Sequence, residues 1–368
     1  MTGKVGLVKI LQYNGGMIHQ KRYLELDALR GFAAVFVMFF HYTEGKNAWS
    51  GFDLGVSGVD LFFLISGFVI FMSINKVSSG REFVINRAAR LYPTYWACVT
   101  FTFGVIILLR LIHFNLNHAR EVGFIDYAAN LTMFQYYLHI PDIDVPYWTM
   151  IIEMLFYLLI LFLYETKLLK YIIVIGCLLN VYIIIDFVMI TLHYIPNYSR
   201  YFPLLNHFAL FFGGIIFYQL MHGMISKLKG YIIISFCLLT QIIIYRFAGS
   251  DPAHISLFQY IGMLLLYFTL FILFVNGKLK FIISKPAVFL GKISFALYLI
   301  HNYVFRGVIG LLERRFNIPF LISTLGVTVP IVILLAYLIT VYIEKPYGKK
   351  MKVFLNDKFN NKNSSLKI

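Results

Sequence analysis

The chain has 368 residues, of which 60% are hydrophobic and only 13% charged, with 37 Phe and 26 Tyr. This composition excludes a soluble domain of ordinary make-up and predicts an all-α polytopic membrane protein. A net charge of +15 suggests nucleic acid, but a soluble nucleic-acid-binding protein would not carry several long apolar runs. Cys98, Cys177 and Cys237 lie in apolar runs without paired spacing, so we expect neither a disulfide framework nor a metal site.

Ten apolar stretches are close to the length that crosses a bilayer as a helix, about 20 residues. In chain order they are residues 24–42, 54–74, 91–109, 148–163, 168–190, 201–221, 230–245, 254–275, 293–311 and 318–342. Around them we expect a cytoplasmic N-terminal segment (1–25), a transmembrane domain (26–346) and a cytoplasmic basic tail (347–368). Residues 127–137 are predicted to be interfacial or re-entrant, since an eleventh span would invert everything downstream.

The distribution of Lys and Arg predicts the orientation. With the N-terminus inside, the inside segments hold 24 of the 32 basic residues and the outside segments hold 8. Both termini are therefore predicted to be cytoplasmic, in a multi-pass protein of the inner (plasma) membrane. Arg30 then lies at the cytoplasmic edge of the first span, and His41 lies in the outer half of the membrane.

Arg30 and His41 frame the first span. Eleven residues turn a helix through about three full turns, so both side chains leave the same face, about 16 Å apart along the axis. Ionisable groups within a membrane are costly and mark functional sites. The alternative is a histidine satisfied by a neighbouring helix and an arginine that anchors the span.

The second span and the loop after it carry further charges. Asp60 lies in an apolar run with glycines that suit close helix packing, and it is expected to pair with a basic group. Arg87 and Arg90 share a helix face, and with Arg81 they suit a phosphate-bearing ligand through bidentate hydrogen bonds. Anchoring to lipid head groups is the alternative.

Later spans add an acid and a second histidine. Glu153, about one and a half turns after Trp148, lies at a depth similar to that of His41 and needs a partner, for which a histidine is the simplest choice. A purely structural ion pair is the alternative. Tyr298 and His301 lie within the predicted span 293–311, which makes His301 a second intramembrane histidine.

Six motifs in this order resemble the membrane-bound acyltransferase-3 family, from about residue 26 to 346. They are Leu-Asp-Ala-Leu-Arg30-Gly with His41, Val-Asp60-Leu-Phe-Phe-Leu-Ile-Ser-Gly-Phe, Arg87-x-x-Arg90 with Tyr-Pro, Trp148-x-x-x-x-Glu153-x-x-Phe-Tyr, Ser294-Phe-Ala-Leu-Tyr298-Leu-Ile-His301 and Ile-Glu344-Lys-Pro. Phe295 stands where tyrosine is common in the family. We expect a stand-alone form, without the esterase-like extra domain that many members carry.

The resemblance implies an O-acyltransferase that moves an acyl group, expected to be acetyl, from cytoplasmic acyl-CoA to a hydroxyl. The acceptor is expected to be a cell-surface glycan or a lipid-linked saccharide. Carried over by position, Arg30 and His41 match the family's arginine and essential histidine, Arg87 and Arg90 its cytoplasmic pair, and Trp148 and Glu153 its outer aromatic and acid. Neutral His41 would act as general base, with Glu153 or a similar group holding its tautomer and stabilising the imidazolium.

Two other classes of function fit the same residues. In a proton-coupled transporter or flippase, the intramembrane His, Asp and Glu would form a proton relay. Transporters commonly contain internal repeats, and none is visible in this sequence. A sensor or scaffold without catalysis would tolerate loss of His41.

Overall fold

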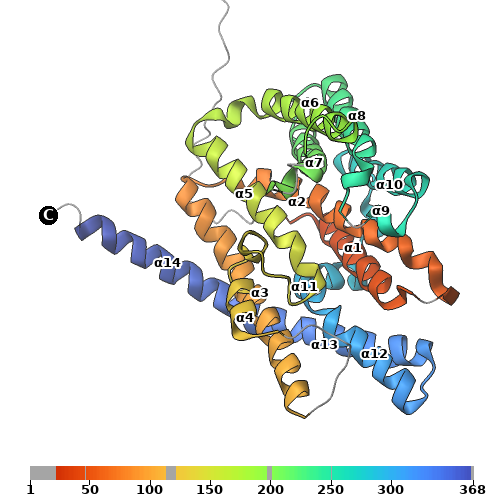
Figure 1. Cartoon of the computed structure of the whole chain (residues 1–368). Coiled ribbons are helices and arrows are strands. Elements are labelled where there is room, and N and C mark those ends of the chain that lie inside the picture. Colours follow the sequence, from red (N-terminus) through yellow and green to blue (C-terminus); the bar gives the residue numbers. More distant parts are fainter. Residues whose placement is uncertain (1–21, 46, 113–121, 197–200, 250, 366–368) are drawn as a thin grey trace, which may run out of the picture.

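The computed structural model describes residues 22–45, 47–112, 122–196, 201–249 and 251–365, and these form helices without strands (Figure 1). The α-helices are α1 (Leu24–Thr43), α2 (Gly58–Ile74), α3 (Gly80–Leu111), α4 (Phe124–Asn130), α5 (Trp148–Glu165), α6 (Ile172–Thr191), α7 (Phe208–Met221), α8 (Lys227–Ile243), α9 (Asp251–His254), α10 (Leu257–Val275), α11 (Lys285–Ile300), α12 (Tyr303–Phe316), α13 (Val329–Ile339) and α14 (Lys345–Ser365). The predicted all-α class is confirmed. Most of the predicted segment 1–25 lies outside the described residues.

The described helices have the length and apolar composition of membrane-spanning segments. Six helical segments are long and apolar enough to cross a bilayer, and the pair α11 and α12, taken as one broken span, adds a seventh. Helix α7 is apolar but has only 14 residues. The chain is thus a multi-pass membrane protein, whereas the number of ten spans stays a prediction. The predicted non-spanning stretch 127–137 forms only the end of α4 and a short 3₁₀ turn.

Two helix pairs at the centre pack closely because small residues line their contacts. Helix α1 lies against α11, and a Cβ added at Gly31 would come within 2.7 Å of the carbonyl oxygen of Ala287. Helix α2 lies against α7, where a Cβ at Gly214 would collide with the carbonyl oxygen of Leu64. Small residues let backbones approach in a membrane, where burial alone drives little association between helices. These two pairs hold α1 and α2, which carry Arg30, His41 and Asp60.

The predicted span 293–311 is not one straight helix. The chain bends by 78° between α11 and α12, and His301 and Asn302 occupy the break. The apolar run predicts one continuous helix. In the structure, the carboxylate of Asp144 accepts hydrogen bonds from the first backbone N–H of α12, that of Tyr303. This long-range contact has no signature in the local pattern.

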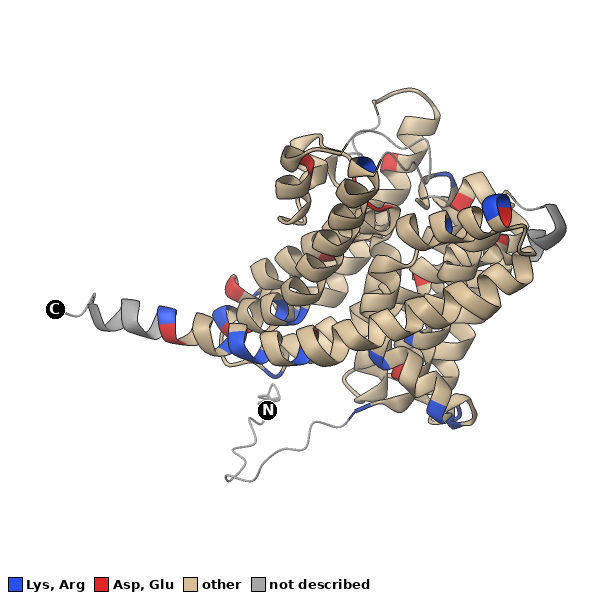
Figure 2. Cartoon of the chain, turned by 90° about the horizontal axis from the view of Figure 1, so that it is seen from below, with Lys and Arg blue, Asp and Glu red and all other residues tan. Residues whose placement is uncertain are grey.

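The C-terminal helix is longer than a bilayer is thick. The continuous helical segment Ile322–Lys358 has 37 residues and would measure about 55 Å, against about 30 Å of hydrocarbon. Its α14 portion runs beside α3 and then away from the other helices (Figure 1). Basic residues gather along α14 (Figure 2), namely Lys345, Lys349, Lys350, Lys352 and Lys358. Such a basic end suits an anionic membrane surface.

Candidate active site

Five of the residues predicted to form the site line one cavity. Its walls enclose about 730 Å³ of space that includes open solvent. Arg30 of α1, Arg87 and Arg90 of α3, Glu153 of α5 and Tyr298 of α11 all border it. The remaining walls are mostly apolar and come chiefly from α2, with further residues of α3, α5 and α11. Four helices therefore bring together residues that are more than 260 positions apart in the chain. We call this space the arginine cavity.

The three arginines are held by different means. Nη2 of Arg87 donates a hydrogen bond to Oγ of Ser73 at 2.8 Å, and the guanidinium lies 5.8 Å from the ring centre of Phe83. Nη1 of Arg30 lies 3.8 Å from a carboxylate oxygen of Asp27, and its side chain is 18% exposed. Arg90 is exposed. Among the described residues no carboxylate lies within ion-pair distance of Arg87 or Arg90. The exposed guanidinium of Arg90 is thus available to an anion, and no carboxylate of the described residues competes for Arg87, which lines the same cavity.

Arg81, which the sequence groups with Arg87 and Arg90, does not line this cavity. Its Nη2 donates a hydrogen bond to the backbone carbonyl of Asn356 in α14, at 3.2 Å. The side chain thereby helps to join α14 to the start of α3. The difference arises because Arg81 lies six residues before Arg87, near the end of α3 that faces α14.

Glu153 contacts the cavity rather than His41. Its carboxylate accepts a hydrogen bond from the hydroxyl of Tyr157, one turn later on α5. It also accepts one from Oγ of Ser66 on α2, at 3.4 Å. No hydrogen bond joins Glu153 to His41 among the described residues. The expected histidine partner of this acid is therefore replaced by two hydroxyls.

His41 instead faces the second histidine. The imidazole rings of His41 and His301 have their centres 5.2 Å apart. Nδ1 of His301 lies 2.7 Å from the backbone carbonyl of Tyr298. A carbonyl can only accept, so Nδ1 carries the proton and Nε2 presents a lone pair. This Nε2 and Nδ1 of His41 are buried without a hydrogen-bond partner among the described residues.

Tyr298 connects the two parts of the site. Its side chain borders the arginine cavity, and its ring centre lies 5.8 Å from that of His301. Its ring also packs edge-on against Phe62, another residue of the cavity wall. The cavity, Tyr298 and the histidine pair therefore form one contiguous region.

Asp60 and Trp148 lie beside the cavity without lining it. Asp60 is 1% exposed, and one carboxylate oxygen lies 3.8 Å from Nδ1 of His207 at the start of α7. The expected basic partner of Asp60 is thus a histidine. The Trp148 ring centre is 5.7 Å from that of His207, and both rings contact Phe63, which does line the cavity. This arrangement places both residues behind one cavity wall.

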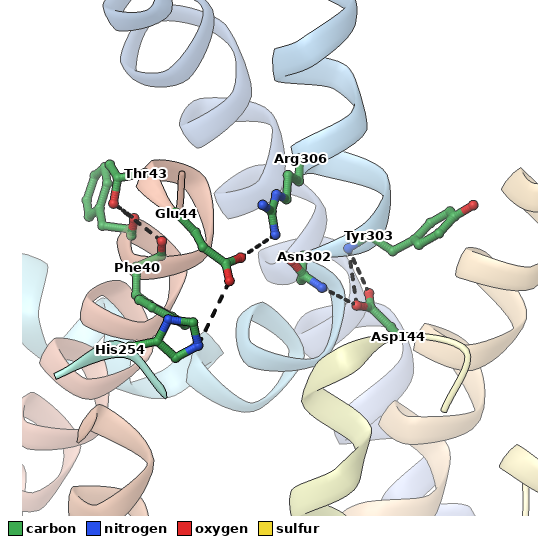
Figure 3. Close-up of polar contacts among 9 residues, drawn as sticks. Phe40, Thr43, Glu44, Asp144, His254, Asn302, Tyr303 and Arg306 are labelled. Carbon is green, nitrogen blue, oxygen red and sulfur yellow. Dashed lines mark hydrogen bonds and ion pairs between the residues drawn. The ribbon is translucent and has the colours of Figure 1, made fainter. Parts of the chain in front are cut away.

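Sequence reasoning missed a charged cluster in which Glu44, at the end of α1, meets His254 and Arg306 (Figure 3). Nη1 of Arg306 on α12 lies 2.5 Å from the carboxylate of Glu44, which follows α1. Nε2 of His254 lies 3.9 Å from the other oxygen of Glu44, and its ring packs on Phe40. These side chains are partly exposed, and they link α1, α9 and α12 around His41.

Asp144 was also missed, and it contacts the other side of the break between α11 and α12 (Figure 3). Its carboxylate accepts hydrogen bonds from Nδ2 of Asn302 at 3.0 Å and from the backbone N–H of Tyr303 at 3.1 Å. Asp144 is 1% exposed, and burial raises the pKa of its carboxyl to about 7 although both hydrogen bonds lower it. Burial likewise raises the pKa of nearby Asp142 to about 6.

No group of three or more His, Cys, Asp or Glu side chains suited to a metal ion occurs among the described residues. The fold and the site define a multi-pass membrane protein in which an arginine-lined cavity adjoins a histidine pair, with Nδ1 of His41 and Nε2 of His301 buried. This combination suits transfer of a group from an anionic donor, with a proton taken up inside the membrane.

The chain belongs to the acyltransferase-3 family, whose acyltransferase domain it matches over residues 23–337. It is thus a membrane acyltransferase. A protein named as an acetyltransferase, ORF330 of Acidianus two-tailed virus, is 27% identical over 307 residues, which cover 80% of this chain and 87% of the viral protein.

Two bacterial relatives match a shorter part. The exopolysaccharide production protein ExoZ of Rhizobium meliloti is 32% identical over 127 residues, covering 33% of this chain and 37% of ExoZ. Nodulation protein 10 of Rhizobium leguminosarum bv. viciae is 30% identical over 166 residues, covering 38% and 43% of the two chains. No solved structure matches the chain significantly.

Proposed function

We propose that this acyltransferase moves an acyl group, acetyl in the first instance, from cytoplasmic acyl-CoA to a hydroxyl of a cell-surface glycan or lipid-linked saccharide. The observation that carries the proposal is the contiguity of the arginine cavity with the histidine pair through Tyr298. The name of ExoZ, which refers to exopolysaccharide production, supports a glycan acceptor. The protein would work in the plasma membrane with both termini in the cytoplasm.

The donor would bind with its phosphates at the arginines. Coenzyme A carries a diphosphate and a 3′-phosphate, and planar guanidinium groups match phosphate oxygens in bidentate pairs. Arg30, Arg87 and Arg90 supply three such groups around one cavity. The thin pantetheine arm could then extend past Tyr298 toward His41. Glu153, hydrogen-bonded to Tyr157, would help to shape the wall of this donor site.

His41 would act as the general base. The acceptor oxygen attacks the thioester carbonyl carbon, the new C–O ester bond forms, and the C–S bond breaks. The hydroxyl proton passes to the imidazole of His41 and from there to the departing thiolate of coenzyme A. His301, whose tautomer is set by the Tyr298 carbonyl, would keep a lone pair directed into the same buried space. This shared space makes His301 the second candidate for the base.

Radiolabelled acetyl-CoA offered to inverted membrane vesicles tests the proposal. The expected result is label in ester linkage on extracted glycans or glycolipids, absent with the His41→Ala variant. A transporter or flippase would leave acetyl groups unattached to glycan, and a scaffold would not respond to His41→Ala. Either of those outcomes would reject the acyl-transfer function.

A further inference from the structure

We propose that Asp144 is a positioning residue for acyl transfer, which holds the first turn of α12 and thereby fixes His301 opposite His41. The inference rests on the proposed function, because it assigns the histidine pair to catalysis. It adds a residue from another part of the chain, the segment that leads into α5. Asp144 itself contacts α12, and the proposed role involves no contact with either substrate.

The break between α11 and α12 needs a partner for its backbone. The first turn of a helix leaves N–H groups without acceptors, and a side chain at the N-cap position usually supplies one. Asn302 occupies that position but makes no such cap, since its own backbone conformation is helical. The Asp144 carboxylate takes over this role from outside, through the Tyr303 N–H and the Asn302 amide. A negative charge there also favours the positive end of the helix dipole.

His301 has little freedom once this contact exists. It lies between the last turn of α11 and the first turn of α12, and its Nδ1 is tied back to the Tyr298 carbonyl. The ring is completely buried. The direction in which the chain leaves α11 therefore decides where Nε2 of His301 points relative to His41. Displacement of a reacting group by about 1 Å can cost about 100-fold in rate.

A second tether holds the same helix from the opposite side. Arg306, less than one turn after Tyr303, pairs with Glu44, the residue that directly follows α1. The Arg306 side chain is 43% exposed and that of Glu44 is 32% exposed, so water weakens this pair. Asp144, in contrast, is buried, so loss of its carboxylate leaves the Tyr303 N–H and the Asn302 amide without their charged acceptor. We therefore assign the dominant positioning role to Asp144.

The test compares Asp144→Asn with Asp142→Asn in proteoliposomes. Asp142 is a matched control two residues away, because its carboxylate accepts a hydrogen bond from Gln135 and, among the described residues, makes no hydrogen bond to α12. For Asp144→Asn we expect kcat to fall about 100-fold while KM for acetyl-CoA and the Kd of coenzyme A stay near wild type. The double variant Asp144→Asn with Asn302→Asp exchanges acceptor and donor, and it should recover most of kcat.

A second measurement does not depend on activity. Diethyl pyrocarbonate should modify His301 faster in Asp144→Asn than in wild type, with His222 as an internal reference. An unchanged kcat in Asp144→Asn overturns the inference. The inference also fails if Asp144→Asn loses both kcat and coenzyme A binding and the exchange variant recovers neither. If wild-type protein transfers no acyl group but His301 is exposed by Asp144→Asn, the proposed function fails and the placement of His301 by Asp144 stands. If the modification rate does not change, the placement fails.

Discussion

The arginine cavity and the histidine pair are neighbours, yet they are built in opposite ways. The cavity opens to solvent and Arg90 is exposed, whereas His301 is completely buried and Nδ1 of His41 has no hydrogen-bond partner among the described residues. Charged phosphates need room and free donors. A general base needs a dry environment in which imidazole stays neutral until it accepts a proton. The comparison teaches that donor binding and proton transfer use separate residues, so mutations should separate them.

The largest effect is expected from the histidines. If both rings serve one proton-transfer step, His41→Gln and His301→Gln should each lower kcat by about 10²–10⁴-fold, and the double variant should lose little more. Single-turnover rates measure this. His222→Gln is the matched control, because Nδ1 of His222 also lies on a backbone carbonyl, that of Tyr218, but the residue is outside the site. If the loss of kcat in the double variant equals the product of the two single losses, the two histidines do not share one proton-transfer step.

The arginines should show the reverse pattern. Arg87→Lys and Arg90→Lys keep the charge but lose the planar guanidinium that binds phosphate in a bidentate manner. Coenzyme A should therefore bind about tenfold more weakly, while the rate of acyl transfer from bound donor changes little. Equilibrium binding of coenzyme A measures this. Arg81→Lys serves as the control, since Arg81 contacts α14 and not the cavity. Equal weakening by Arg81→Lys would mean that general membrane charge, not the cavity, holds the donor.

The influence of Asp144 should depend on pH. Burial raises the pKa of its carboxyl to about 7, so below that pH the folded wild type carries a neutral group much like the amide of Asp144→Asn. The ratio of wild-type to variant kcat should therefore grow as pH rises through about 7. The histidines are common to both proteins and cancel in the ratio. The other titratable groups that interact with Asp144 are Asp142, Tyr42, Tyr147, Tyr298, Tyr303 and Cys98, and they too are common to both proteins. A ratio that is constant with pH would contradict this role of the charge.

The smallest effect is expected at the exposed tether. Glu44→Gln should change kcat by less than about threefold, because exposed ion pairs contribute about 0–1 kcal/mol. High salt should lower the kcat of the wild type by about as much as the substitution does, and it should not change the kcat of Glu44→Gln. A large loss in Glu44→Gln would make the exposed pair, rather than Asp144, the main support of α12.

The sequence predicts the helical class and the charged residues of the cavity, but not how the two histidines meet. Arg30 and Glu153 stand out as charges in or beside apolar runs, Arg87 and Arg90 stand out as a pair on one helix face, and their motifs carry the family resemblance. The contact of His41 with His301 joins residues 260 positions apart and depends on a break inside an apolar run. Local periodicity predicts a straight helix there.

Asp144 is invisible to sequence reasoning for a related reason. It lies among Pro and Asp residues of a connecting segment, where a carboxylate is ordinary, and only the fold brings it to Tyr303. Glu153 shows the converse error. Its depth suggests a histidine partner, but two nearby hydroxyls from α2 and α5 satisfy it first. Pairing inside a membrane is decided by helix contacts that spacing alone does not contain.

The central claim is that His41 takes the acceptor proton in a space distinct from the donor site. The most direct test is His41→Gln, measured for acetyl transfer and for coenzyme A binding in the same preparation. Glutamine can hydrogen-bond but cannot take up a proton at neutral pH. The account predicts that transfer falls by about 10²–10⁴-fold with the Kd for coenzyme A nearly unchanged. Substantial transfer by His41→Gln, or parallel loss of coenzyme A binding, would contradict it.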